Sequence, residues 1–169
     1  MKPFIYVITL LCFPAMAFCQ DITGLWKGTM LNDSSKQALE YEIVISKEKG
    51  KYSAFSHTWF IINDKKHYGI KKLNVRVARD GKIVLQDTKL VDNNYPVLPL
   101  KNVLQLNVLD LVTSGSETML NGIFVTNSSK DYKGLTGSIS IKRVNLLSQS
   151  YLMQYLNKND VDNNFTAGK

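Results

Sequence analysis

Cysteine is scarce in this chain of 169 residues. The only two, Cys12 and Cys19, fall in or at the edge of an apolar N-terminal segment. A disulfide framework or a zinc site built on cysteine is therefore excluded for the remainder of the chain. Histidine is equally scarce, with only His57 and His67, which we interpret as ordinary surface or rim residues. We expect no metal and no cofactor, so stability must come from a hydrophobic core.

Long hydrophobic runs are also missing, except at residues 5–13, where an apolar stretch is broken by Pro14. This run is shorter than the roughly 20 residues that a membrane-spanning helix needs. A basic start, a short apolar run and small residues after it predict a signal peptide over residues 1–19, cut after Ala17 or Cys19. We therefore expect an exported protein, periplasmic or extracellular, with a lipid anchor on Cys19 as the alternative.

Clustered positive charge is a third absence. The formal net charge is +7, from 21 basic and 14 acidic residues, but the basic residues are scattered along the chain. Nucleic-acid binding favours a basic stripe with interleaved aromatic residues, so we expect no nucleic-acid partner. A scattered surplus is compatible with weak association with an envelope or membrane surface.

What the sequence does contain is a row of short segments in which apolar and polar residues alternate, separated by turn residues. Such a period of two is typical of half-buried strands. A parity slip near Lys71-Lys72 predicts a bulge, and Asp80-Gly81 predicts a two-residue hairpin turn. The eight predicted strands are residues 22–31, 39–46, 51–61, 67–79, 82–91, 102–112, 117–126 and 135–144.

Eight sequential strands with short connections predict an all-β fold, an eight-stranded antiparallel up-and-down barrel. Apolar residues at helical spacing in residues 145–157, with Ser148 as the candidate cap, predict a short C-terminal helix. The expected domain covers residues 20–157, and the polar residues 158–169 are expected to form a flexible tail.

Three residues carry a resemblance to a known family. Gly24 and Trp26 open the first predicted strand, and Arg143 closes the last. This arrangement resembles the lipocalin and wider calycin pattern, as found in small exported bacterial domains. The resemblance implies that Arg143 packs over Trp26 to close the floor of the barrel, with Gly24 beside them, and that a C-terminal helix lies against the wall.

Aromatic residues gather on the third and fourth predicted strands and in the irregular segment 92–100. We select as candidate ligand-binding residues Phe55, His57, Trp59, Tyr68 and Tyr95. The alternative is that the strand aromatics only fill the core, because a sequence does not separate residues that line a cavity from residues that fill it.

Paired carboxylates are the remaining candidate chemistry. Glu40 and Glu42 share one face of a predicted strand opposite an apolar face, which indicates a solvated outer surface and not an acid–base pair. The chain has no phosphate loop, dinucleotide fingerprint or nucleophile elbow. We therefore expect no enzyme, with a small hydrolase or isomerase at the barrel mouth as the weaker alternative.

Two functional hypotheses follow. The first is an exported, non-enzymatic binding protein that holds a small apolar or amphipathic ligand inside the barrel. The second is an envelope-associated module with a filled barrel, which would bind a protein partner through its outer surface.

Overall fold

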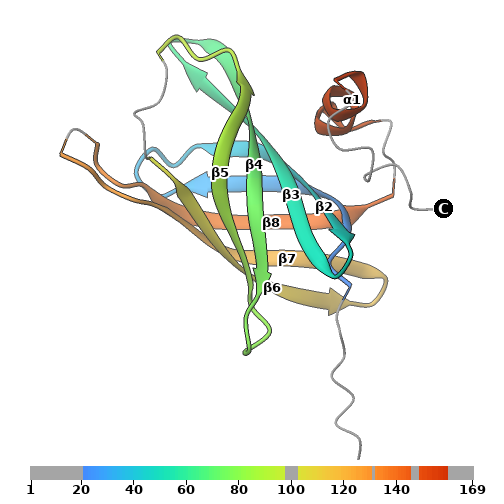
Figure 1. Ribbon diagram of the computed structural model, residues 1–169. Coiled ribbons are helices and arrows are strands. Elements are labelled where there is room, and N and C mark those ends of the chain that lie inside the picture. Colours follow the sequence, from blue (N-terminus) through green and yellow to red (C-terminus); the bar gives the residue numbers. More distant parts are fainter. Residues whose placement is uncertain (1–20, 98–102, 131, 146–148, 160–169) are drawn as a thin grey trace, which may run out of the picture.

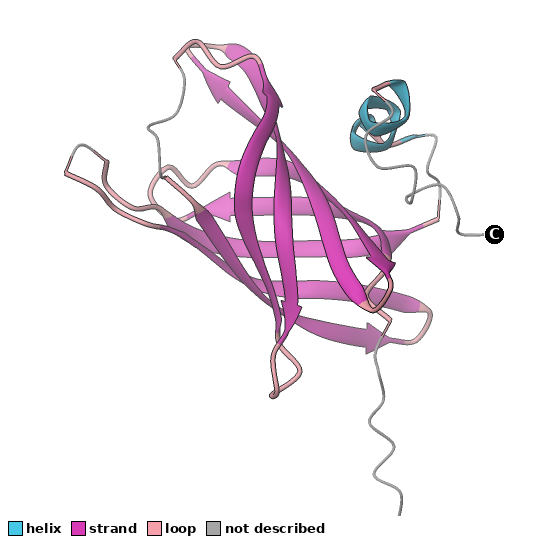
Figure 2. Cartoon of the chain, viewed as in Figure 1, coloured by secondary structure: helices cyan, strands magenta, loops and turns pink. Residues whose placement is uncertain are grey.

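The computed structural model describes residues 21–97, 103–130, 132–145 and 149–159. Eight antiparallel strands follow one another around a closed barrel, each paired with its neighbours in sequence and β1 with β8 (Figure 1). One short helix follows the last strand (Figure 2). The predicted fold class is therefore confirmed, whereas the predicted signal peptide and most of the predicted tail lie outside the described residues.

The strands have nearly the predicted positions. Their bounds are β1 Gly24–Asn32, β2 Ala38–Glu48, β3 Lys51–Ile62, β4 Lys65–Val77, β5 Ile83–Asn93, β6 Gln105–Ser114, β7 Glu117–Thr126 and β8 Thr136–Val144. Helix α1 spans Tyr151–Lys158.

The hairpin turns follow local backbone preferences. Between β3 and β4, Asn63 and Asp64 have φ values of 49° and 58°, as a two-residue type I′ turn requires. The predicted two-residue turn at Asp80-Gly81 is wrong. There the loop covers residues 78–82, because the Ala78 N–H donates to the Lys82 carbonyl at 2.8 Å and only Gly81 has a positive φ.

A bulge lies where the sequence predicts one, beside Lys71 and Lys72, but its extra residues are on the partner strand β5 and not on β4. The register of β4 against β5 shifts between Ile70 and Lys71 and again between Lys72 and Leu73. Thr88 and Val91 of β5 are the residues left without a partner on β4, and such extra residues change the facing of the strand that carries them. Along β4 the alternation is regular, so Lys71 lines the inside of the barrel while Ile70 packs on the outside.

One half of the barrel is filled. Inward-facing side chains from the end where β1 begins form a cluster that includes Trp26, Ile43, Leu85, Leu109 and Leu120, all with 0% exposure. Burying a side chain of this size contributes about 2 kcal/mol. Packing in this filled half holds the strands in place, and the opposite ends of the same strands surround the other half of the barrel.

Helix α1 lies against the outside of the barrel, over β2 and β3 (Figure 1). Its apolar face packs Leu152, Met153 and Leu156 on an outer cluster that includes Phe55 and Ile70. The N-cap is Ser150, whose hydroxyl accepts a hydrogen bond from the Met153 N–H; the predicted cap, Ser148, lies outside the described residues. Nowhere in the described ranges does a helix have the length and apolar character to cross a membrane.

Candidate functional site

The other half of the barrel is hollow. A cavity of about 870 Å³ lies at the end where β1, β3 and β7 finish. Its apolar lining comes from Met30, Leu39, Phe60, Phe124 and Leu135. A cavity of this size is within the range of small-molecule binding sites.

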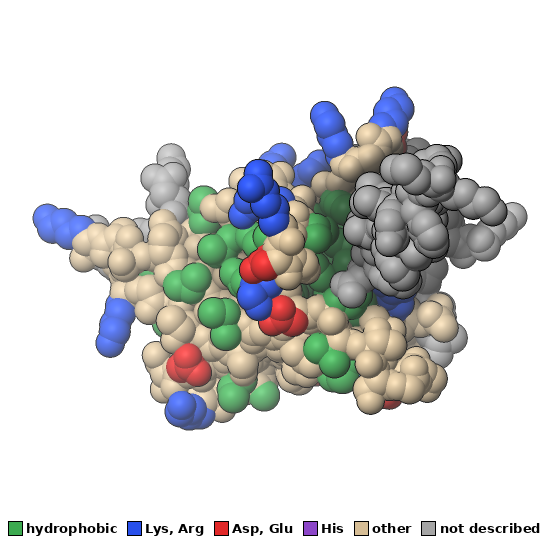
Figure 3. Space-filling view, turned by 90° about the horizontal axis from the view of Figure 1, so that it is seen from below, with side chains coloured by type: hydrophobic (Ala, Val, Ile, Leu, Met, Phe, Trp, Pro, Cys, Tyr) green, Lys and Arg blue, Asp and Glu red, His purple; other side chains and the backbone are tan. Residues whose placement is uncertain are grey.

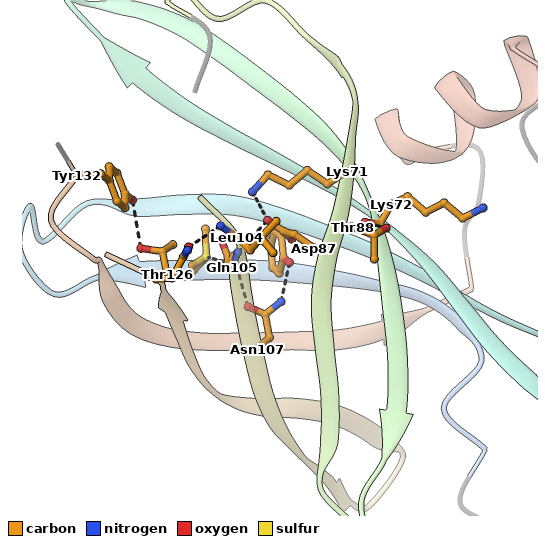
Figure 4. Close-up of polar contacts among 12 residues, drawn as sticks. Lys71, Lys72, Asp87, Thr88, Leu104, Gln105, Asn107, Thr126 and Tyr132 are labelled. Carbon is orange, nitrogen blue, oxygen red and sulfur yellow. Dashed lines mark hydrogen bonds and ion pairs between the residues drawn. The ribbon is translucent and has the colours of Figure 1, made fainter. Parts of the chain in front are cut away.

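A charged pair faces this cavity from neighbouring strands. Asp87 on β5 is buried, and its Oδ2 accepts a hydrogen bond from the Lys71 ammonium on β4 (Figure 4). The backbone N–H of Gln105 donates to the same oxygen at 3.2 Å. Deeper in the barrel, the Gln105 side-chain amide donates to Asn107 at 2.8 Å. The cavity therefore combines apolar walls with a charged pair that a backbone N–H holds in place.

Strand ends explain how this polar group arises. The β5–β6 ladder pairs Ile83 to Gln86 with Leu109 to Leu106 and goes no further. The next donor along β6, the Gln105 N–H, bonds to the Asp87 carboxylate in place of a strand carbonyl. A buried N–H needs a partner, and the Asp87 side chain supplies it where the ladder ends.

Tyr95 is the candidate ligand-binding residue that lines the cavity. Its ring lies 4.9 Å from that of Phe60, centroid to centroid. Its hydroxyl lies over Gly69, where an added Cβ would come within 1.8 Å of it. Burial, and to a lesser extent the charge of Asp87, raises the pKa of Tyr95 to about 12, so its hydroxyl is protonated at neutral pH.

The other four candidates lie outside the barrel. Phe55 packs in the outer cluster beneath α1, together with Tyr68. His57 lies 4.7 Å from Trp59 and 5.8 Å from Tyr68 between ring centroids. The face of β3 that carries Phe55, His57 and Trp59 is the outer one. Thr58 and Phe60 line the cavity, and the residues that alternate with them lie on the side of the helix. These four residues are therefore held apart from Tyr95.

The layer under α1 is aromatic and poorly suited to carry charge on His57. Burial lowers the pKa of His57, and the nearby Glu42 carboxylate opposes this only in part. The ring of Tyr151, from the first turn of α1, lies 5.5 Å from Trp59. On the outer side, the Lys66 ammonium lies 4.2 Å from the centre of the Trp59 ring.

The predicted solvated face with Glu40 and Glu42 is wrong for Glu42. Glu40 is exposed, but Glu42 is buried by α1, which covers β2 at this point. The Glu42 carboxylate accepts hydrogen bonds from the Ser150 hydroxyl at 2.7 Å and from the Leu152 N–H at 3.0 Å, and it pairs with Lys27 at 2.8 Å. It therefore anchors the positive end of the helix dipole.

The floor contains the contact that the sequence analysis expected. Trp26 pairs with Arg143 across β1 and β8, and the guanidinium carbon lies 4.8 Å from the centre of the Trp26 ring. The indole N–H donates to the Ile22 carbonyl at 3.1 Å, and Gly24 begins β1 beside them. A cation–π contact of this kind contributes roughly 1 kcal/mol. These residues close the filled end and do not reach the cavity.

On the outer surface, apolar residues of β6 and β7 lie opposite one another, because Val125 pairs with Leu106 and Ile123 pairs with Val108. Ile123, Val112 and Val125 on β6 and β7 are exposed. The face in Figure 3 carries hydrophobic side chains in several groups, interrupted by lysine and acidic side chains. Within the described ranges, His, Cys, Asp and Glu side chains do not gather in groups of three that could hold a metal ion.

The sequence analysis missed the charged pair. Two signals for it were present: Asp87 continues the inward parity of Ile83 and Leu85 on β5, and Lys71 continues that of Leu73 on β4. Neither signal shows that the two side chains meet, because that depends on the β4–β5 register.

Comparison of the chain with protein-family models, with curated proteins and with solved structures gives no match. The function must therefore be argued from the geometry of the cavity.

Proposed function

We propose that the protein binds a small amphipathic molecule in the hollow half of its barrel. The observation that carries this proposal is the cavity of about 870 Å³, whose lining is largely apolar and whose polar groups converge at Asp87. Ligand sites typically combine apolar walls with a few polar groups that fix orientation. An apolar ligand body would contact Phe60 and Phe124, and its polar end would face the charged pair.

The division of the interior supports a binding role. The filled half, centred on Trp26 and Leu120, supplies the packing that holds the strands. The hollow half can then remain unfilled without loss of the fold, and an apolar ligand would gain the contacts that the cavity walls lack. The resemblance of Trp26 and Arg143 to the lipocalin pattern is consistent with this role.

The alternative, an interaction module with a filled barrel, agrees less well with a cavity of this size. The proposed role is also non-enzymatic, because Lys71 and Asp87 are engaged with each other and are suited to orient a ligand.

Export is part of the proposal. The intact mass of the protein from its own host would distinguish cleavage after Ala17, cleavage after Cys19 and a lipid on Cys19.

A cavity-filling variant and a matched control on the outer surface test the proposal. Leu39 lines the cavity, and its neighbour Glu40 is exposed on the outer face of the same strand. We expect the wild-type protein to bind the apolar fluorescent probe N-phenyl-1-naphthylamine, Leu39→Trp to lose most of this binding, and Glu40→Trp to retain it. Equal binding by all three proteins would place the probe elsewhere and contradict the proposal. Native mass spectrometry of protein from its own host would identify a ligand that co-purifies.

A further inference from the structure

The cavity contains opposite charges that lie against each other. The Lys71 ammonium and the Asp87 carboxylate are in contact, and the side chains are 27% and 5% exposed. A buried charge is tolerated when it is paired and hydrogen-bonded. Here the pairing is internal to the protein, so this polar group has both a positive and a negative pole but no net charge.

The position of the pair is fixed by the backbone. Regular alternation along β4 directs Lys71 inward, and the Gln105 N–H holds Asp87 at the end of the β5–β6 ladder. The Lys71 ammonium and the Gln105 N–H both donate to Oδ2 of the carboxylate. Oδ1 accepts neither of these hydrogen bonds, and Lys71 has three N–H donors of which this pair uses one.

The groups around the pair are neutral, with the exception of Lys89. The Gln105 amide, the Thr58 and Thr126 hydroxyls and the Tyr95 hydroxyl also line the cavity, and Tyr95 is protonated at neutral pH. Lys89 lines the cavity too, but it is exposed to solvent. A bound anion would lie beside the Asp87 carboxylate, and a bound cation would lie beside the Lys71 ammonium. Either ion would lose its hydration without finding an unpaired opposite charge to offset that cost.

We infer that the ligand is an uncharged amphipath whose head group both donates and accepts hydrogen bonds, such as a long-chain alcohol, and not a fatty acid or an amine. This inference rests on the proposed function. The head group would donate toward the Asp87 carboxylate and accept from the Lys71 ammonium, while the alkyl chain would contact the apolar wall.

A head-group series of constant chain length tests the inference. Dodecanol, dodecanoate and dodecylamine compete with N-phenyl-1-naphthylamine at neutral pH, the alcohol below its solubility limit and the charged compounds below their micelle concentrations. For the wild-type protein we expect dodecanol to bind about tenfold more tightly than either charged compound, the factor that one unpaired buried polar group implies. Dodecanoate or dodecylamine binding as tightly as dodecanol would overturn the inference without any variant.

Variants at the pair should switch the preference. In Asp87→Asn, Lys71 loses its counter-charge, so dodecanoate should gain about tenfold over dodecanol. In Lys71→Met, Asp87 is left unpaired, so dodecylamine should gain instead. Asp110→Asn and Lys72→Met are the matched controls, because they make the same changes of net charge at exposed positions. Both controls should keep the wild-type order.

The outcomes separate the two proposals. If the probe binds and is displaced but the order is the same in Asp87→Asn, Lys71→Met and the wild type, the inference fails and the binding function stands. If the probe does not bind in the barrel at all, the proposed function fails. Circular dichroism and thermal unfolding show whether each variant folds. If Lys71→Met does not fold, Lys71→Gln replaces it. If neither variant folds, the order of ligand affinities in the wild-type protein decides whether the inference holds.

Discussion

Two residues, Glu42 and Gly69, are explained by contacts with segments that are distant in sequence. Glu42 on β2 bonds to the start of α1, more than 100 residues later, through the Ser150 hydroxyl and the Leu152 N–H. Gly69 on β4 leaves room for the Tyr95 hydroxyl. In both cases the residue type is explained by a contact that is remote in sequence.

Glu42 should make the stability depend on pH. Burial opposes its ionisation, but hydrogen bonds from Lys27, Leu152 and Ser150 outweigh this and hold its pKa below the ordinary value of 4.5. Because the pKa is lower in the folded state, this stabilisation is complete above pH 4.5 and is lost as the pH falls through the folded-state pKa. We expect Glu42→Gln to lower the free energy of unfolding by about 1–3 kcal/mol at neutral pH, with a smaller difference in acid.

Urea unfolding of the wild type and Glu42→Gln at several pH values measures this difference. The control is Glu40→Gln, at an exposed position on the same strand face, which should change the unfolding free energy by less than about 0.5 kcal/mol. A constant difference between wild type and Glu42→Gln down to low pH would show that the ionised carboxylate is not the stabilising species.

Gly69→Ala should displace Tyr95 and leave the barrel folded. The added Cβ would lie 1.8 Å from the Tyr95 hydroxyl oxygen, and the end of a side chain can move more easily than backbone. We expect a loss of roughly 1 kcal/mol in unfolding free energy and loss of the Phe60–Tyr95 ring contact in a crystal structure. In a Tyr95→Ala background the same glycine substitution should cost less; an equal cost would contradict the proposed clash.

At the scale of elements, α1 is an outer layer and not an appendage. It covers the part of β2 and β3 where Phe55 and His57 face outward, and this makes the outer surface of the barrel buried there. Because an eight-residue helix is marginal alone, α1 is stabilised by this packing and by its cap.

Substitutions on the two faces of α1 should differ strongly. Leu152 is fully buried against the barrel, whereas Asn157 is exposed. We expect Leu152→Ala to lower the free energy of unfolding by about 2–4 kcal/mol and Asn157→Ala to change it by less than about 0.5 kcal/mol. Chemical unfolding followed by circular dichroism measures both. A small effect of Leu152→Ala would mean that the helix detaches readily from the barrel.

At the scale of the whole molecule, packing is divided between a filled and a hollow half. The closing contact of Trp26 with Arg143 belongs to the filled half, and the charged pair of Lys71 and Asp87 belongs to the cavity. Stability and the proposed binding are therefore assigned to opposite ends of one barrel.

The same substitution in the two halves should reveal this division. Leu120 is fully buried in the filled half, and Leu135 is half-buried at the cavity. Leu120→Ala removes close packing and should cost about 3–5 kcal/mol, whereas Leu135→Ala enlarges an existing cavity and should cost about 1 kcal/mol. Equal losses of unfolding free energy, measured in urea, would mean that the two halves are packed alike.

The order of elements could be predicted from the sequence because it depends on local patterns. Alternation placed the eight strands. The predicted bulge near Lys71 is present in the β4–β5 register, but its extra residues belong to β5, because the strand that supplies them depends on the pairing. The turn at Asp80-Gly81 was predicted too short, since a hairpin loop is also set by the backbone hydrogen bond between Ala78 and Lys82.

Local patterns in the sequence are enough to establish the alternation of residues, the approximate positions of the turns and the all-β class. The inward face of β3 depends on the tertiary structure, since period two fixes two faces but not their direction, and both carry aromatic residues. The tertiary structure also decided that α1 buries Glu42 and that Lys71 meets Asp87. Whether the barrel is hollow depends on how side chains from all the strands fill one shared volume, which no local pattern records.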